Sequence, residues 1–318
     1  MTEPTPTETP RPWLIAAWPG MGNVAIIAAG MLIQQLAMKP VGQLGSRLHF
    51  DVGHVEVTKG LISAPRLPRG VLYRTPQNRA GRPLYVFVGE AQPAVSGFAY
   101  AQKLLDRAVD LGVERVLTFA SLASGVHPSD DSSVYAAATS SELLDECRRH
   151  EILPAADGQI GGLNGVLLGA AASRGLAGIC LMGEIPFFAA NMPNPKAARA
   201  ALDTFAGLAD LTLDLSELDG PIAAVEEAMV RHMERVEGGR TDKDVGEEGP
   251  DASSGSEAKP EASSRPRLDA ETARRIDEMF DQARSDRSRA VELKVELDRL
   301  GVFDAYEDQF LDLFRRAG

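Results

Sequence analysis

One local pattern recurs along this chain: a short apolar run ends at a glycine-rich turn, and a stretch of small residues follows. The first copy is the run at residues 14–18 with the turn PGMGN at 19–23, and the second is the turn GQIGGLNG at 158–165. A third apolar run ends in GEIP at residues 183–186. In open α/β sheets, turns at the carboxyl ends of buried strands are where ligands bind. The pattern predicts an α/β domain with its candidate site at that edge.

Apolar runs that alternate with helical stretches predict the order of elements. Strands are expected at residues 13–18, 54–58, 70–73, 84–88, 115–119 and 178–182, and helices at residues 24–38, 97–111, 131–150, 164–173 and 195–208. Asn23 and Asn194 stand where helix N-caps are expected, and Pro195 suits a first helical position because it lacks an N–H. This alternation implies a three-layer αβα fold with a mostly parallel central sheet.

Composition changes along the chain and predicts four regions. Residues 1–11 are expected to be a disordered lead-in, and residues 12–236 an α/β domain that ends in a charged amphipathic helix. Residues 237–267 hold almost no apolar side chains, so they cannot offset the backbone entropy lost on folding. We therefore expect a disordered acidic linker there. Residues 268–318 are predicted to be a helical tail.

The helical tail carries apolar side chains at helical spacing. They form three stripes: Ile276, Met279, Phe280 and Ala283; Leu293, Leu297 and Leu300; and Phe303, Tyr306, Phe310 and Phe314. So short a segment buries too little surface for a robust core of its own. We expect it to dock on its own α/β domain, on a sister subunit or on another protein. An aromatic stripe is more often core than a binding face, whereas the tethering linker favours a partner.

Net negative charge is concentrated in the C-terminal part of the chain. Residues 1–216 carry 17 Lys and Arg against 19 Asp and Glu, residues 217–318 carry 16 against 26, and the whole chain has a formal net charge of −12. A near-neutral domain with an acidic tail argues against binding to nucleic acid or to anionic lipid. The first residues lack a signal-peptide pattern, and no apolar stretch reaches the length of a membrane span. We expect a cytoplasmic protein.

Reactive constellations are sparse in this sequence. Cys147 and Cys180 are too few for a disulfide framework, and no Cys/His cluster has zinc spacing. Ser124, His127 and Asp130 lie too close together in sequence for an ordinary hydrolase triad, and the nucleophile-elbow motif is missing. We expect a polar loop there, and we expect no catalytic residue, no metal and no cofactor.

The glycine turns and the acidic residues after two strands are the candidate ligand-binding residues. They are Gly20, Gly22, Asn23, Glu90, Gly161, Gly162, Asn164 and Glu184. Backbone N–H groups of the first turn, at a helix start, would bind a phosphate or a carboxylate. The alternative is a tight turn that needs glycine for its dihedral angles. Asn164 in the second turn either binds a ligand or caps its own helix.

Glu90 and Glu184 each follow a buried apolar run. If their strands lie side by side, the two carboxylates face one crevice and their pKa values separate for acid–base chemistry. The alternative is that each carboxylate accepts hydrogen bonds from backbone N–H groups of a neighbouring loop. The residues leave both interpretations open.

Four segments in order resemble the proteasome assembly chaperone 2-like family. They are WPGMGN at 18–23, GGLNG at 161–165, GICLMGEIP at 178–186 and PNPKAA at 193–198. The resemblance spans residues 13–216 and implies a phosphorylase/hydrolase-like three-layer α/β fold with a tendency to form homo-oligomers. Eukaryotic and archaeal members help to assemble the proteasome core or bind it, and many bacterial members have no established role.

Two features attributed to that family are not matched here. Proteasome-binding members often end in a hydrophobic residue, a tyrosine and one final residue, whereas this chain ends FRRAG, so we expect no direct docking by the tail. Some members are labelled ATP-grasp-like carboligases, but the lysines of residues 1–216 all lie outside the glycine turns. We therefore predict a non-enzymatic, homo-oligomeric assembly chaperone or scaffold. The alternative is a nucleotide- or carboxylate-binding protein or enzyme that uses the crevice at the glycine turns.

Overall fold

The computed structural model describes residues 10–45, 48–51, 55–77, 81–241, 270–285, 289–300, 302–303, 306, 309–310 and 313. The chain divides into two compact units, Met1–Glu226 and Glu227–Gly318. The predicted lead-in up to residue 9 and the predicted linker from residue 242 onward lie outside the described residues.

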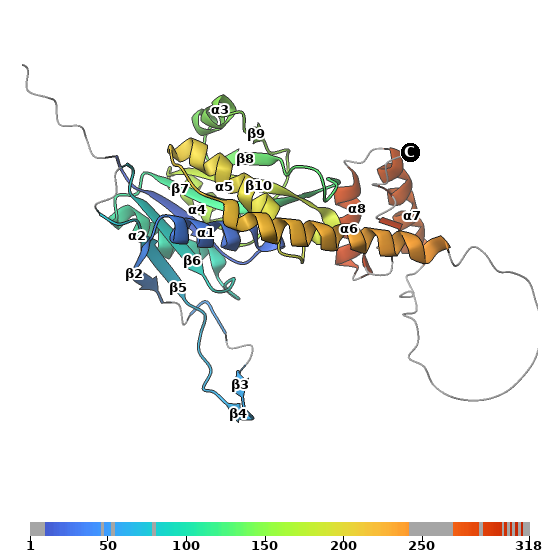
Figure 1. Cartoon of the computed structure of the whole chain (residues 1–318), viewed down its shortest axis with the longest axis horizontal. Helices are drawn as coiled ribbons and strands as arrows, with labels where there is room; N and C mark the ends of the chain where they lie inside the picture. The colour runs from blue at the N-terminus through green and yellow to red at the C-terminus, as the bar shows by residue number, and fades with distance from the viewer. Residues whose placement is uncertain are drawn as a thin grey trace, which may run out of the picture. The chain divides into compact units, whose positions relative to one another are not determined.

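Within the described part of the first unit, eight strands form one sheet in the order β2-β5-β6-β1-β7-β10-β8-β9 (Figure 1). The four central strands are parallel: β6 (Leu84–Gly89), β1 (Trp13–Ala17), β7 (Arg115–Ser124) and β10 (Ala177–Pro186). Antiparallel pairing adds β5 (Gly70–Arg74) and β2 (Lys39–Leu44) on one side and β8 (Val134–Ala138) on the other, where β9 (Leu153–Pro154) lies parallel to β8. The predicted α/β fold with a mostly parallel sheet is confirmed.

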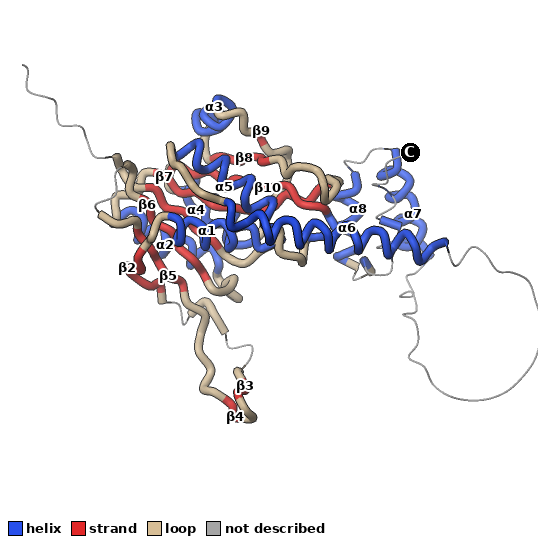
Figure 2. Tube along the Cα trace, in the orientation of Figure 1, coloured by secondary structure: helices blue, strands red, loops and turns tan. Residues whose placement is uncertain are grey.

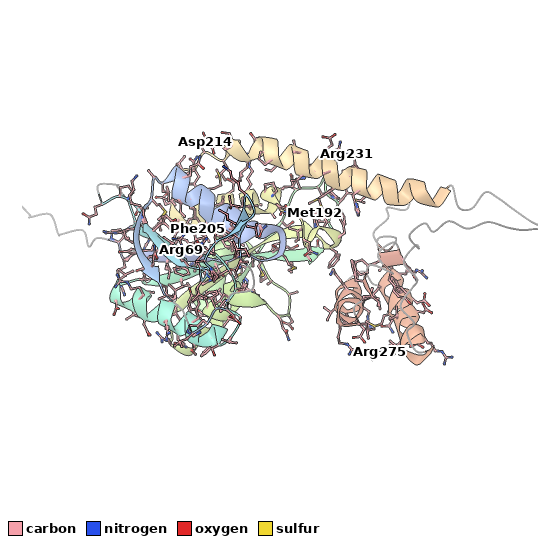
Figure 3. The ribbon with its side chains drawn as sticks, turned by 90° about the horizontal axis from the view of Figure 1, so that it is seen from below. Arg69, Met192, Phe205, Asp214, Arg231 and Arg275 are labelled. Carbon is pink, nitrogen blue, oxygen red and sulfur yellow. The ribbon has the colours of Figure 1, made fainter. Side chains whose placement is uncertain are left out.

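Helices cover both faces of this sheet (Figure 2). One face packs α1 (Val24–Gln35) and α5 (Pro195–Ala209), and the other packs α2 (Gly97–Asp110) and α4 (Gly162–Ser173). Side chains alternate along β1, so Ile15 faces the α1 and α5 layer and Leu14 faces the α2 and α4 layer. Phe205 of α5, labelled in Figure 3, packs edge-on against Phe119 of β7 with ring centroids 5.9 Å apart. The result is the expected three-layer arrangement.

The single helical region predicted at residues 131–150 is wrong in its first half. That part of the chain forms β8, and the helix α3 (Ser141–Arg149) begins only after Ser140, whose hydroxyl accepts a hydrogen bond from the N–H of Leu143. The sequence of β8 is VYAAA, and its alanines suit a helix locally. Pairing with the long strand β10 overrides that preference, because it satisfies the backbone hydrogen bonds of β8.

The third glycine turn, predicted at residues 183–186, is part of a strand. β10 continues to Pro186 and pairs with β7 as far as Ser124. Gly183 is needed for close packing instead: a Cβ placed there would lie 2.5 Å from the carbonyl oxygen of Ala197 in α5. The helix therefore rests directly on the backbone of the strand.

A separate hairpin, β3 (Val57–Thr58) with β4 (Leu61–Ile62), projects away from the sheet (Figure 1). Its two-residue turn, Lys59 and Gly60, has positive φ at both positions, which is the geometry that a tight hairpin turn favours. The strand expected at residues 54–58 thus pairs with the segment that follows it. Short 3₁₀ helices complete the first unit: η1 (Met21–Asn23), η2 (Phe187–Ala189) and η3 (Ser216–Leu218).

After η3, α6 (Asp219–Thr241) begins in the first unit, extends into the second and continues five residues beyond its predicted end at Val236. The second unit also holds α7 (Ala270–Ser285) and α8 (Ala290–Arg299), so the predicted helical tail is confirmed where it is described. Each predicted stripe there supplies buried residues, among them Phe280, Leu293 and Phe310, and Phe314 lies outside the described residues. Among the helices that the structure describes, none combines the length and apolar character of a bilayer span.

Candidate functional site

The first glycine turn, residues 19–23, follows β1 at the carboxyl edge of the sheet. Gly22 and Asn23 both adopt left-handed backbone conformations, with φ of 62° and 49°. The N–H of Gly22 donates to the carbonyl oxygen of Ala190 at 2.9 Å, and that of Asn23 donates to the carbonyl oxygen of Gly20 at 2.9 Å. The N–H of Asn23 is thus bonded within the turn and that of Gly22 to the loop after β10, and because both are already used by the protein, the tight-turn interpretation is favoured over a phosphate cradle. A ligand-binding role for these residues stays a prediction.

Asn23 occupies the expected N-cap position of α1, but its side chain makes no capping hydrogen bond. The expectation of a side-chain cap is wrong there, because a left-handed Asn23 does not have the extended backbone typical of a capping residue. Asn194 behaves as predicted: its side-chain oxygen accepts from the N–H of Ala197 at 3.0 Å, and Pro195 is the first helical residue of α5.

Asn164 connects the second glycine turn to the first. Its side-chain oxygen accepts from the N–H of Trp18 at 3.1 Å, and its side-chain nitrogen donates to the carbonyl oxygen of Trp18 at 3.2 Å. Asn164 is 5% exposed and lies inside α4, whose N-cap is Gly161. It is therefore not the helix cap, because both side-chain atoms bind the backbone at the end of β1.

Gln92, which the sequence did not single out, makes a second connection between the same turns. Its side-chain nitrogen donates to the carbonyl oxygen of Pro19 at 2.7 Å, and its side-chain oxygen accepts from the N–H of Leu163 at 2.9 Å. Gly162, with φ of 65°, lies against this side chain, and a Cβ there would lie 3.0 Å from the Gln92 nitrogen. Nothing local in the sequence marks Gln92, since both of its partners come from other loops.

The end of β1 is also fixed by ring packing. Trp18 is fully buried, and its ring centroid lies 5.4 Å from that of Phe87 on β6 and 6.5 Å from that of Tyr100 on α2. A Cβ on Gly89 would lie 2.2 Å from the indole, so the Trp18 ring rests directly on the β6 backbone. These contacts fix the position of the Trp18 ring at the end of β1.

The loop after β10 and the end of β7 also contact the first turn. The N–H of Asn194, after β10, donates to the carbonyl oxygen of Gly22 at 2.7 Å. The hydroxyl of Ser121, on β7, donates to the carbonyl oxygen of Met21 at 2.5 Å. The structure therefore brings Gly20, Gly22, Asn23, Gly161, Gly162 and Asn164 together at one edge.

Glu90 follows β6 at the same edge, and its carboxylate is ion-paired. It accepts from the Arg66 guanidinium at 2.6 Å, and from the N–H and the guanidinium of Arg69, each at 3.0 Å; Arg69 is labelled in Figure 3. Partial burial raises the pKa of the Glu90 carboxyl, but the hydrogen bonds from Arg66 and Arg69 outweigh burial and hold that pKa below its ordinary value. Glu90 therefore stays ionised near neutral pH and holds the segment before β5.

Glu184 lies in β10 and not in a turn, and of the two interpretations that the sequence left open, the one in which the two carboxylates converge is wrong. The strands of Glu90 and Glu184 are separated by β1 and β7, and adjacent strands are about 4.8 Å apart. The N–H of Glu184 donates to the carbonyl oxygen of Ser133 at 2.9 Å, and the carbonyl oxygen of Glu184 accepts from the hydroxyl of Ser132 at 2.7 Å. The two acids do not share a crevice, because two apolar strands separate them.

Two hollows flank the first turn. A groove of about 440 Å³ is lined by Pro19, Asn23, Ile26, Ile27, Val88, Gly89, Glu90 and Pro193. A smaller hollow of about 260 Å³ is lined by Gly20, Met21, Gly22, Asn23, Ala190, Asn191 and Met192, the last labelled in Figure 3. Asn23 borders both, and its side chain is exposed between them.

The serine- and histidine-containing loop after β7 is held by its own turns. The Ser124 hydroxyl accepts from the N–H of Val126 at 3.0 Å, and the His127 ring accepts from the N–H of Ser129 at 3.2 Å. These bonds favour the polar-loop interpretation over a hydrolase triad. Among the residues that the structure describes, no three His, Cys, Asp or Glu side chains gather as a metal site would require.

The model of the PAC2 family matches residues 14–233, more than half of the chain. The chain belongs to the PAC2 family. The matched range contains both glycine turns, the long strand β10 and the capped start of α5. The resemblance drawn from those segments of the sequence is therefore confirmed.

This PAC2-family chain is similar to PbaB of Pyrococcus furiosus, whose solved structure is described as that of an archaeal proteasome activator. The two are 26% identical with a TM-score of 0.61, over 72% of this chain and 96% of PbaB. A Mycobacterium tuberculosis proteasome-assembly chaperone homologue is 19% identical with a TM-score of 0.60, over 69% and 94% of the two chains, and shows the fold alone. An uncharacterized protein of Methanocaldococcus jannaschii is 28% identical over 223 residues, 67% of this chain and 80% of that protein.

Proposed function

We propose that this chain is a non-enzymatic, homo-oligomeric assembly chaperone or scaffold whose partner is a multi-subunit protein. The observation that carries the proposal is how the polar side chains at the carboxyl edge are used. Asn164 binds the backbone of Trp18 at the end of β1, Gln92 binds the backbone of the two glycine turns, and Glu90 binds two arginines. Each of these groups maintains the shape of the surface.

The pKa shifts of Glu90 and Cys180 support the same proposal. A general acid or base works best with a pKa near the working pH. The pKa of Glu90 is held below its ordinary value, away from neutrality. Burial raises the pKa of the Cys180 thiol to about 11, so that group stays protonated and is a poor nucleophile. Both groups suit a structural role better than a catalytic one.

The relatives suggest the kind of partner. PbaB is described as a proteasome activator, and the structural match includes 96% of the PbaB chain. We take the proteasome core as the first partner to test. The same proposal includes a location in the cytoplasm, where the two buried, unpaired thiols Cys147 and Cys180 would stay reduced.

The test is capture of partners by the tagged full chain from native lysate, quantified by mass spectrometry, followed by native mass measurement with the purified partner. We expect one multi-subunit assembly at a fixed ratio. An excess of untagged chain is the control and should displace that assembly from the tagged chain. Recovery of no assembly, together with a defined turnover of a small substrate, would contradict the proposal.

A second candidate function is binding of a nucleotide or a carboxylate at the glycine turns. The groove of about 440 Å³ favours it, since small-molecule sites span roughly 300–1,000 Å³, and Asn23 offers an exposed side-chain amide beside it. Thermal shifts with ATP, adenosine and citrate test this function. A probe at 100 times its Kd should stabilise the chain by about 2.7 kcal/mol, and Asn23→Ala should reduce that shift. A flat response to all three probes counts against it.

A further inference from the structure

Asn23 carries a side-chain amide that the described part of the molecule does not use. The side chain is exposed, makes no capping hydrogen bond to α1 and is not joined by a hydrogen bond to any other described residue. Its left-handed backbone, with φ of 49°, is what takes it out of the capping geometry. Both the donor and the acceptor of this amide are therefore open to a molecule outside the chain.

The two other amides at this edge show what such a group binds. Asn164 accepts from the N–H of Trp18 and donates to the carbonyl oxygen of the same residue. Gln92 likewise accepts from one backbone N–H and donates to one backbone carbonyl oxygen. A side-chain amide matches a peptide backbone because each offers both donors and acceptors. Asn23 has the same chemistry to offer to an incoming extended segment, whose edge presents N–H and C=O groups.

The groove beside Asn23 has half-buried apolar walls. These are Pro19, Ile26, Ile27 and Val88, together with the exposed Pro193. Glu90 is the other polar residue that lines the groove, and its carboxylate already accepts from Arg66 and Arg69. An aliphatic side chain placed between these walls would remove apolar surface of both molecules from water. The groove therefore fits an aliphatic side chain whose backbone is bound by Asn23.

Two methionines line the smaller hollow, which Asn23 also borders. Met21 is 48% exposed, and Met192, labelled in Figure 3, is half-buried. Methionine is unbranched and polarisable, so it adapts to side chains of different shape and is common at surfaces that bind many partners. In an extended segment, every second side chain lies on the same face. A segment that crosses Asn23 would thus present one side chain to the groove and another to the smaller hollow.

The charges around the two hollows favour a neutral segment. None of the described residues that line either hollow is a lysine or an arginine, whereas phosphate groups are bound through such cations. Beside the groove, the one carboxylate of Glu90 is paired with the two guanidinium groups of Arg66 and Arg69, which leaves an excess of one positive charge. That excess disfavours a segment with Lys or Arg next to its aliphatic residues. A neutral peptide therefore matches this edge better than a nucleotide does.

We propose that the edge around Asn23 binds an extended, neutral, aliphatic segment of the partner protein, with the Asn23 amide on its backbone and an aliphatic side chain in the groove. This inference rests on the proposed function, which supplies a protein partner, and it names the surface and the chemistry that recognise that partner. The turn that carries Asn23 is held in place beforehand. The N–H of Gly22 donates to Ala190, and its carbonyl oxygen accepts from Asn194, so little ordering of this turn is needed on binding.

The first experiment measures binding of the full chain to an array of N-acetylated, C-amidated heptapeptides, Gly-Ser-X-Ser-X-Ser-Gly, in which each X is Leu, Ile, Val or Met. We expect members of this set to bind. The peptide with Ser at both X positions should not bind, and Lys in place of the Ser between the two X positions should weaken binding. Absence of binding to every aliphatic member overturns the proposal, as does equal binding to the all-serine peptide.

The second experiment tests the amide. The tightest-binding peptide is labelled with fluorescein, and its Kd is measured by anisotropy. Asn23→Gly keeps the left-handed backbone without strain and removes the amide, so the Kd should rise about tenfold through the loss of two hydrogen bonds. Ser96→Gly is the matched control, because Ser96 is also an exposed, left-handed N-cap without a side-chain capping bond, at the start of α2. The control should keep the wild-type Kd, and both variants should keep the wild-type thermal midpoint. An unchanged Kd for Asn23→Gly overturns the proposal.

A third experiment locates the contact. The same peptide carries photo-leucine at its first X position and is irradiated with the wild-type chain. Digestion and mass spectrometry should find the peptide attached within the first turns of α1 or at the end of β6, the segments that supply Ile26, Ile27 and Val88. Attachment confined to other parts of the chain overturns the groove as the binding site.

The outcomes also separate this inference from the function on which it rests. In the lysate capture, Asn23→Gly should recover less of the assembly than the wild type and the Ser96→Gly control. If the wild type and Asn23→Gly recover equal amounts, this inference fails and the proposed function stands. If the wild type recovers none, the proposed function fails. If ATP, adenosine or citrate binds while no peptide does, binding of a small molecule replaces this inference.

Discussion

The two ends of the four central strands are held by different chemistry. At the carboxyl ends, the neutral side chains of Asn164 and Gln92 bind backbone groups of the adjoining loops. At the amino ends, the ring of Trp13 lies between two guanidinium groups, 4.5 Å from that of Arg82 and 4.4 Å from that of Arg115. Besides the partly exposed ion pairs of Glu90, the carboxyl end uses the amides of Asn164 and Gln92, whereas Trp13 at the amino end is held by charged groups.

Carboxylates complete the charged end. The indole N–H of Trp13 donates to Glu114 at 2.9 Å, and Glu114 also pairs with Arg82. Arg115 donates two hydrogen bonds to Glu146, at 2.7 and 2.9 Å. Exposed fractions of the paired side chains range from 13% to 32%, so water still reaches them.

The difference follows from burial. An ion pair moved into the dry interior loses its hydration, at a cost that its own attraction often fails to recover. A side-chain amide satisfies a buried backbone N–H and C=O together at a much smaller cost. The amides at the carboxyl edge thus hold its shape through hydrogen bonds to the backbone, which suits recognition of another protein better than catalysis. Four predictions test the contrast.

The largest effect is expected from Asn164→Leu. It leaves the N–H and C=O of Trp18 without partners, and each buried unsatisfied group costs about 1–3 kcal/mol. The free energy of unfolding should fall by about 2–5 kcal/mol in urea denaturation. Asn191→Ala, at an exposed position nearby, is the control and should stay within about 0.5 kcal/mol of the wild type. A cost below about 1 kcal/mol for Asn164→Leu would show that these bonds do not hold the edge.

Trp13→Leu should have the next largest effect, a loss of about 2–4 kcal/mol, because it removes a buried ring and both cation–π contacts. Trp13→Phe keeps a ring between the guanidinium groups and loses the hydrogen bond to Glu114, so its cost should be about 1–2 kcal/mol. Equal costs for the two variants, again by urea denaturation, would mean that the ring itself contributes nothing.

The two edges should differ in how the cost of a substitution to the free energy of unfolding depends on pH. The hydrogen bond from Arg115 lowers the pKa of the Glu146 carboxyl in the folded state, so the pair stabilises the fold above the unfolded value of about 4.3 and loses that contribution as the pH falls through the folded value. Glu146→Gln should therefore be less stable than the wild type at pH 7, and the gap should close in acid. Asn164→Leu should keep its gap across that range. If the stability difference between Glu146→Gln and the wild type stayed constant with pH, the ion pair of Glu146 would not stabilise the amino edge through its charge.

Salt should produce the smallest change. Glu114→Gln at the partly exposed amino edge should cost less than about 1 kcal/mol. In 1 M NaCl, where the screening length is about 3 Å, that cost should shrink. The cost of Asn164→Leu should stay the same, because neutral hydrogen bonds are not screened. Thermal midpoints with and without salt provide the comparison, and a salt-dependent cost for Asn164→Leu would remove the distinction.

Elements with a strong local signal were predictable. The apolar runs of β1, β6 and β10 are bounded by proline or glycine, and the Asn194–Pro195 pair marks the start of α5 through its own cap. The patterns that indicate a buried strand or a helix cap involve only a few neighbouring residues, so they can be recognised in the sequence.

Features set by distant partners were not predictable. The alanine-rich β8 becomes a strand only because β10 offers it an edge, and Gly183 serves the close approach of α5 instead of a turn. Gln92 joins loops that follow two different strands, and Glu90 meets Arg66 and Arg69 instead of Glu184.

The sequence alone determined the class of fold, the family and the position of the two glycine turns, because hydrophobic spacing and turn chemistry are local properties of the chain. Only the tertiary structure decided what the side chains in those turns do. The strand order separates Glu90 from Glu184 and places Asn164 against Trp18. Which groups meet across a sheet depends on strand order, and no short stretch of sequence encodes that order.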